Sequence, residues 1–95
     1  MVRLEPRTYA LPYPAVFDAV VAVLREGGAV LVERQHGRAS RRRLLNRVTA
    51  FVGAEGTTRT TVVLEAGGIL GTRRLLRRVV SDLDRYLGWY YRPAA

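Results

Sequence analysis

The chain has 95 residues, no cysteine, and sixteen arginines against eight acidic residues with no lysine, which gives a formal charge of +8. This length allows one domain with a single core, and the missing cysteines exclude disulfides and thiolate zinc sites. The longest uncharged run, Thr8 to Phe17, has ten residues, far fewer than the about 20 that a membrane-spanning helix needs, so we expect no span and a cytoplasmic location by default.

The first half of the chain predicts a strand, a helix and a second strand. Arg3 to Leu11 has the alternation of an edge strand bracketed by proline. Tyr13-Pro14 opens a helix whose apolar residues recur three and four apart, and Gly27-Gly28 ends it. Ala29 to Arg34 is rich in β-branched residues and predicts the second strand, followed by a turn at Gln35-His36-Gly37.

The second half predicts two more strands and a second helix. Arg47 to Val52 alternates apolar and polar residues as a third strand would, and whether this strand begins earlier, at Arg41–Arg43, stays open. Gly53 to Gly56 predicts a hairpin loop, and Thr57 to Glu65 a fourth strand rich in Thr and Val. Thr72 is the expected N-cap of the last helix.

The last helix combines an apolar stripe with a charged outer face. The stripe comprises Leu76, Val80, Leu83 and Leu87. On the outer face we expect two ion pairs, Arg78 with Asp82 and Arg77 with Asp84, each contributing at most a few tenths of a kcal/mol.

The predicted element order is therefore β-α-β-β-β-α. Strands joined by hairpins form an antiparallel sheet, and both helices cover one of its faces, which predicts a two-layer α+β domain spanning residues 1–95. The other face of the sheet is only half suited to water, so it is either exposed to solvent or an interface. Its predicted residues are Arg47, Thr49, Phe51, Arg59, Thr61 and Val63.

No residue pattern meets the requirements of catalysis. The only histidine, His36, lies in a predicted turn without a nucleophile or carboxylate at a telling spacing, and Ser40 and Ser81 lack a flanking glycine elbow. Glu33 and Glu65 end two strands and could form a carboxylate pair, although we interpret them as solvated strand ends. We therefore expect no enzyme, no cofactor and no metal site.

The basic charge favours an anionic partner, and it is also explained by solubility through self-repulsion. The densest cluster holds Arg41, Arg42 and Arg43, with Arg38 and Arg47 nearby. Such a cluster is a candidate for phosphate binding. The alternative is a solvated loop whose like charges discourage pairing of sheet edges.

A second candidate anion site is the glycine-rich segment Gly67 to Arg74, which leads into the last helix. Backbone N–H groups and the positive end of the helix dipole suit an anion there. The segment lacks the lysine and the glycine register of a nucleotide-binding loop. The alternative, an ordinary connection from strand to helix, is the interpretation that we favour.

The start of the last helix resembles that of double-stranded-RNA-binding domains. The residues concerned are Thr72-Arg73-Arg74-Leu75-Leu76-Arg77, with Val80 and Ser81 after them. Those domains also place three antiparallel strands between two helices, and their three cations contact phosphates across a major groove. The resemblance implies this role for Arg73, Arg74 and Arg77.

The C-terminal Trp89, Tyr90 and Tyr91 have three interpretations: packing onto the sheet, a protein interface, or a surface on which bases stack. Taken together, the sequence predicts a non-catalytic binding or interaction module that self-associates as a homo-oligomer. The alternative is a basic domain that contacts nucleic-acid phosphates.

Overall fold

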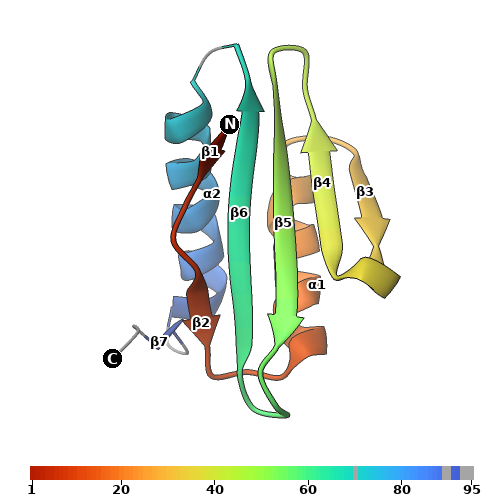
Figure 1. The fold of residues 1–95 in the computed structure, drawn as a ribbon, viewed down its shortest axis with the longest axis vertical. Coiled ribbons are helices and arrows are strands. Elements are labelled where there is room, and N and C mark those ends of the chain that lie inside the picture. The colour runs from red at the N-terminus through yellow and green to blue at the C-terminus, as the bar shows by residue number, and fades with distance from the viewer. Residues whose placement is uncertain (70, 89–90, 93–95) are drawn as a thin grey trace.

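Two helices pack against one face of a seven-stranded antiparallel sheet in the computed structural model, which describes residues 1–69, 71–88 and 91–92 (Figure 1). The elements are β1 (Val2–Arg3), β2 (Arg7–Tyr9), α1 (Tyr13–Arg25), β3 (Val30–Glu33), the 3-10 helix η1 (Arg34–His36), β4 (Arg38–Arg42), β5 (Asn46–Ala54), β6 (Thr60–Gly68), α2 (Thr72–Leu87) and β7 (Tyr91–Arg92). The strand order is β3-β4-β5-β6-β2-β7, and β1 also pairs with β6. The predicted α+β class, with both helices on one face, is confirmed.

The sheet contains three strands more than the four that the sequence predicted: β4, β7 and one that arises because the first strand is divided in two. β4 has no β-branched or aromatic residue, so its own propensity for a strand is low, and its pairing with β3 and β5 on either side compensates. Gly37 allows the turn into β4, because its φ of 61° favours glycine and a Cβ there would collide with the carbonyl oxygen of Val52. The open question at Arg41–Arg43 is settled by a separate strand and a tight turn, in which the N–H of Arg43 donates to the carbonyl of Asn46 at 2.8 Å.

Three other boundaries differ from the prediction. The single strand expected over Arg3–Leu11 is two short strands on β6, interrupted around Pro6, which has no N–H to donate. β6 begins and ends three residues later than expected, so Gly67 and Gly68 belong to the strand and not to a loop. The N-cap of α2 is Gly71 rather than Thr72, with a left-handed φ of 70°.

The core lies between the helices and the sheet. Its helical part comprises Val16, Phe17, Val20, Val21, Val23 and Leu24 of α1 with Leu76, Val79, Leu83 and Leu87 of α2. The sheet contributes the alternating residues Val48, Ala50 and Val52 of β5 and Val62, Leu64 and Ala66 of β6. Both predicted stripes are confirmed, except that Val79 is buried and Val80 only half-buried. This burial supplies the main stabilisation of the fold.

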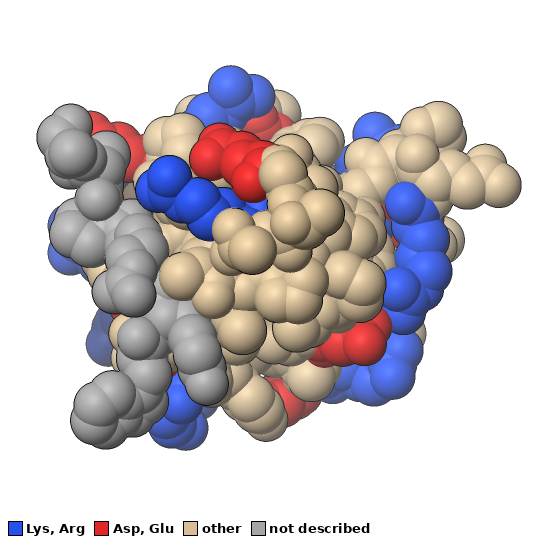
Figure 2. Space-filling model, turned by 90° about the horizontal axis from the view of Figure 1, so that it is seen from below, with Lys and Arg blue, Asp and Glu red and all other residues tan. Residues whose placement is uncertain are grey.

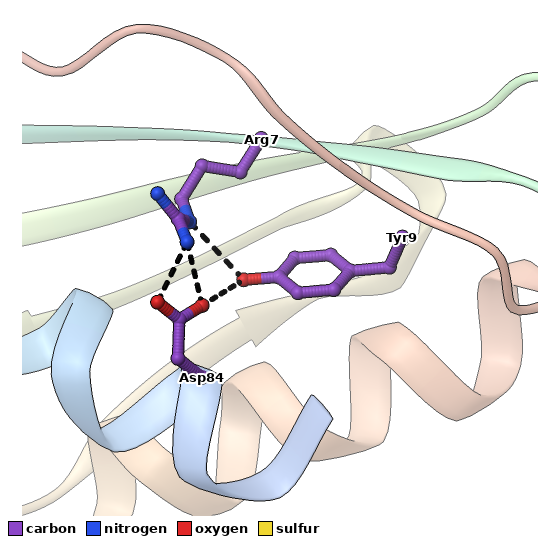
Figure 3. Close-up of polar contacts among 3 residues, drawn as sticks. All are labelled: Arg7, Tyr9 and Asp84. Atoms are coloured by element: carbon purple, nitrogen blue, oxygen red, sulfur yellow. Dashed lines mark hydrogen bonds and ion pairs between the residues drawn. The ribbon is translucent and has the colours of Figure 1, made fainter. Parts of the chain in front are cut away.

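A hydrogen-bonded triad joins the N-terminal strand β2 to α2 (Figure 3). The guanidinium of Arg7 donates to both carboxylate oxygens of Asp84, at 2.8 and 2.6 Å, and the hydroxyl of Tyr9 donates to Asp84 at 2.9 Å. Tyr9 is fully buried. Burial raises the pKa of Tyr9 to about 12; the hydrogen bond with Arg7 lowers it and the one to Asp84 raises it. The sequence analysis had paired Asp84 with Arg77. It could not identify Arg7 as the partner, because two residues 77 positions apart leave no local pattern in the sequence.

Tyr9→Phe should remove a pH dependence of stability at high pH. The unfolded chain loses this phenol proton near pH 10 and the folded protein only near 12. The contribution is therefore fully present below pH 10, and the free energy of unfolding falls as pH rises from 10 to 12, by up to about 1.4 kcal/mol per pH unit. Urea unfolding of both proteins across this range measures the difference. Equal slopes would contradict the role of Tyr9.

Candidate binding surface on the open face of the sheet

The face of the sheet that points away from the helices is not covered by any described segment of the chain (Figure 1). Alternation along β5 places Arg47, Thr49 and Phe51 on this face, as predicted, because Val48, Ala50 and Val52 are buried on the other. Thr61 and Val63 of β6 lie beside them. Arg59 was expected here too, but it is exposed in the loop before β6. We define the open face as this uncovered surface of β1 and β3–β6.

Two ion pairs on the open face neutralise part of its charge. Glu65 forms an ion pair with Arg3, and Glu33 forms one with Arg38 at 2.6 Å, which lowers the pKa of Glu33. Glu65 lies on β6 and Glu33 on β3, with two strands between them, so their backbones are separated by at least about 14 Å, and each carboxylate is paired with an arginine and not with the other. Thr49 and Ser40, paired across β5 and β4, lie between them.

Exposed apolar side chains gather in a concavity of about 720 Å³ on this face. Five of the six large hydrophobic residues that are exposed in the described chain line it: Met1, Leu31, Leu44, Leu45 and Ile69. Leu44 is 98% exposed and Ile69 77%. The sequence analysis missed these residues, although two adjacent leucines at a hairpin tip, where turns are usually polar, are a signal that it could have used.

Three arginines without acidic partners surround this apolar group. Arg42 and Arg47 are directly opposite each other in the register of β4 and β5, and Arg43 follows in the turn. All three are exposed, and no carboxylate of the described residues lies within 4.0 Å of their nitrogens. We define the hairpin end as these three arginines with Leu44, Leu45, Ile69, Met1 and Leu31.

The other end of the sheet has a different surface. Figure 2, which views the molecule from that end, shows a largely uncharged centre with acidic and basic side chains together around it. A hollow of about 340 Å³ there contains Glu55, which accepts a hydrogen bond from Thr61 at 2.8 Å. Unopposed positive charge on the open face is thus a property of the hairpin end.

Arg41, which the sequence grouped with Arg42 and Arg43, does not belong to the exposed cluster. Alternation along β4 turns Ala39 and Arg41 toward the helices, and Arg41 is only 6% exposed. Its Nη1 donates to the carbonyl oxygen of Leu24 at 3.1 Å, at the end of α1. Arg41 therefore does not share a surface with Arg42, because adjacent residues of a strand face opposite sides, and its predicted role in anion binding stays a prediction.

The predicted phosphate contacts on α2, Arg73, Arg74 and Arg77, are exposed and also have no carboxylate within 4.0 Å among the described residues. Helical spacing places Arg73 and Arg77 on the side of α2 that carries Asp84, which faces β2. None of the three lines the concavity. Four strands lie between the helices, one more than double-stranded-RNA-binding domains have, and the resemblance stays a prediction.

The loop before α2 is shorter than the sequence suggested. Gly67 and Gly68 pair with Arg47 and Asn46 of β5, and the N–H of Ile69 donates to the carbonyl of Leu45 at 3.0 Å. The N–H of Ile69 is therefore engaged within the sheet, and Gly67 and Gly68 belong to the strand. Gly68 allows close contact between the strand and the hairpin, since a Cβ there would collide with the carbonyl oxygen of Leu45.

Of the C-terminal aromatic residues, Trp89 and Tyr90 lie outside the described part of the chain. Tyr91 pairs with Tyr9 at the edge of the sheet, with the two ring centroids 5.9 Å apart. The guanidinium of Arg7 lies 4.3 Å from the centre of the Tyr91 ring. Tyr91 thus packs onto the sheet, which was the first of its three interpretations.

The described residues contain no group of three or more histidine, cysteine or acidic side chains that could hold a metal, and none of their helices is long and apolar enough to cross a membrane. His36 is exposed at the end of η1. Ser40, which lines the concavity, has no side-chain hydrogen bond to a histidine or carboxylate of the described chain.

No protein-family model, no curated protein and no solved structure matches this chain. The arguments about function below therefore rest on the residues and their geometry.

His36→Ala should leave the free energy of unfolding within about 0.5 kcal/mol of the parent value, as expected for an exposed side chain without a special contact. Urea unfolding at neutral pH measures this. A larger loss, or a bound metal ion that disappears with the imidazole, would show a role for His36 that its position does not indicate.

Proposed function

We propose that the protein is a non-catalytic binding module that holds an acidic protein segment in the concavity of its open face. The observation that carries the proposal is the hairpin end, where five exposed apolar side chains lie among three arginines without acidic partners. The occupant that fits presents apolar side chains flanked by carboxylates.

The apolar residues provide the driving force. Clusters of exposed apolar side chains are uncommon on isolated proteins and mark interaction sites. Leu44, Ile69 and Met1 each expose more than three quarters of their surface. Their burial against a partner would contribute about 25 cal/mol per Å² of apolar area removed from water.

The arginines determine the charge of the partner. Like charges directly opposite on neighbouring strands destabilise a sheet, and Arg42 and Arg47 occupy such a pair without a carboxylate nearby. A carboxylate between them would remove the repulsion and accept charge-assisted hydrogen bonds. Arginine is also enriched at the centres of protein interfaces.

The shape of the surface favours a protein segment. The molecule extends 37 by 27 Å in the plane of the sheet, or roughly 1,000 Å² in outline, which accommodates the about 800 Å² per partner of a standard interface. A flat membrane would touch only the exposed tips of a concave surface. Bases need aromatic residues to stack on, and among the described residues of this face only the half-buried Phe51 is aromatic.

A second copy of the chain, which the sequence predicted, is the main competitor. Each copy carries a charge of +8, so self-association brings together surfaces that repel each other. An acidic partner instead meets complementary charge, which increases both the association rate and the selectivity.

The double variant Arg42→Gln/Arg47→Gln should bind a short peptide of alternating leucine and glutamate at least about tenfold more weakly than the parent, because truncation of a central interface arginine costs more than about 1 kcal/mol. Fluorescence anisotropy of the labelled peptide at fixed ionic strength measures this. The matched control is Arg59→Gln/Arg77→Gln, which removes the same charge from exposed positions outside the concavity and should change the affinity less than about twofold.

Three outcomes would overturn the proposal. The two double variants could weaken binding equally, which would indicate net charge alone. A peptide with lysine in place of glutamate could bind as tightly. A duplex RNA could bind more tightly than the peptide and depend on Arg73, Arg74 and Arg77, which would favour the phosphate-binding alternative.

Sedimentation of the protein alone at tens of micromolar should show a monomer if an acidic partner is the occupant, because self-repulsion opposes dimerisation. A dimer that Leu44→Ser dissociates would identify a second copy as the occupant instead. Tyr86→Ser serves as the control, since Tyr86 is the remaining large apolar residue that is exposed in the described chain and it lies on α2.

A further inference from the structure

A second cavity lies on the helical side of the sheet, between the end of α1, β4 and the middle of α2. Its volume is about 290 Å³, many times that of a water molecule. Its apolar wall consists of Val23, Leu75 and Val79. The charged residues that line the rest are three arginines and two acidic residues: Arg41, Arg43, Arg78, Glu26 and Asp82. The predicted clusters on β4 and α2 thus meet here, but through Arg78, which the sequence had paired with Asp82.

Arg41 is buried with most of its hydrogen-bonding capacity unused. Only its Nη1 has an acceptor, the carbonyl of Leu24, and its Nε is buried without any partner. An unpaired buried donor costs about 1–3 kcal/mol, and more when it is charged. No described carboxylate lies within 4.0 Å of this guanidinium, so its charge is not compensated either.

The surrounding backbone is shaped to admit this side chain. A Cβ on Gly27 would collide with the guanidinium of Arg41, so the glycine after α1 leaves the room that Arg41 occupies. The carbonyl of Leu24, near the negative end of the helix dipole, fixes one side of the guanidinium. The hydrogen bond from Arg41 to Leu24 is explained by capping of α1, whereas the other N–H groups of this guanidinium have no acceptor within the described part of the chain.

Three arginines outnumber the two acidic residues that line the cavity. Burial lowers the pKa of Arg41, and Arg43 and Arg78 lower it further, whereas Asp82 raises it. Both acidic residues have other partners: Asp82 forms an ion pair with Arg85 at 2.6 Å, and Glu26 accepts a hydrogen bond from Tyr86 at 3.1 Å. Three cations therefore converge with no carboxylate bonded to any of them.

We propose that this cavity is a binding site for a phosphate group. Guanidinium groups match the oxygens of phosphate in geometry and form paired, charge-assisted hydrogen bonds with them. A phosphate in the cavity would accept hydrogen bonds from the guanidinium group of Arg41 on the side that lines the cavity, and the exposed Arg43 and Arg78 would contact the same ligand. The site is independent of the proposed function, because it lies on the other face of the sheet and shares only Arg43 with the hairpin end.

Titration of the full-length protein with inorganic phosphate, followed through the arginine Nε–H signals in ¹H–¹⁵N spectra, tests the site. The Arg41 signal should shift and saturate. Arg78→Gln should weaken binding at least about tenfold, as the loss of a charge-assisted hydrogen bond implies. The control Arg74→Gln removes the same charge one helical turn earlier, at a residue that does not line the cavity, and should weaken binding less than about twofold.

Gly27→Ala provides a second variant that keeps every charge. It should abolish the saturable shift by displacing Arg41, and thermal unfolding without phosphate establishes that it is folded. Parallel titrations identify the source of the phosphate: tighter binding of phenyl phosphate points to a monoester, and tighter binding of dimethyl phosphate to a nucleic-acid backbone.

No saturable shift, or equal losses in Arg78→Gln and Arg74→Gln, would overturn the phosphate site. Acetate that binds as tightly as phosphate would overturn its specificity for phosphate. Arg42→Gln/Arg47→Gln should leave phosphate binding unchanged, so failure of the peptide site and failure of this site are distinguishable.

Discussion

The helices bury their apolar stripes against one face of the sheet, and this one-sided packing determines what each strand can present to its surroundings. Successive residues of β5 point alternately to the core and to the open face: Val48 lies in the core and Phe51 on the open face. Along most of the open face, ion pairs such as Glu33–Arg38 and rows of hydroxyl groups keep the surface compatible with water. At the hairpin end neither compensation is present, and the surface there is both apolar and positively charged.

β4 links the two candidate sites because it is the one strand whose arginines face both ways. Arg42 points to the open face and Arg41 to the helices, so residues that are adjacent in the sequence serve different surfaces. Arg43, in the turn, lines both cavities. β4 contains few residues that favour strands, and its pairing with β3 and β5 holds it in the sheet. Its side chains can therefore be polar.

The end of the molecule where β2 meets α2 shows how a buried polar group is stabilised when partners are present. Tyr9 is as deeply buried as the core leucines, yet its hydroxyl has both Arg7 and Asp84 within hydrogen-bonding distance. Arg41 has a single bond for a guanidinium that is almost as deeply buried. Arg7 is paired with a carboxylate and Arg41 is not. This contrast is the physical reason to infer a structural role for Arg7 and to propose ligand binding at Arg41.

The sequence by itself determined the helices, the outward alternation of β5 and β6 and the α+β class, because hydrophobic periodicity is local and each stripe must find a core. Only the tertiary structure decided the rest. β4 could not be predicted, since its stability comes from its neighbours. The partner of Asp84 could not be predicted either, because it is the distant Arg7. Asp82 has two arginines within one helical turn, Arg78 and Arg85, and spacing alone does not choose between them. The convergence of Arg41 with Arg78 likewise depends on how α1, β4 and α2 pack, which no spacing within one element encodes.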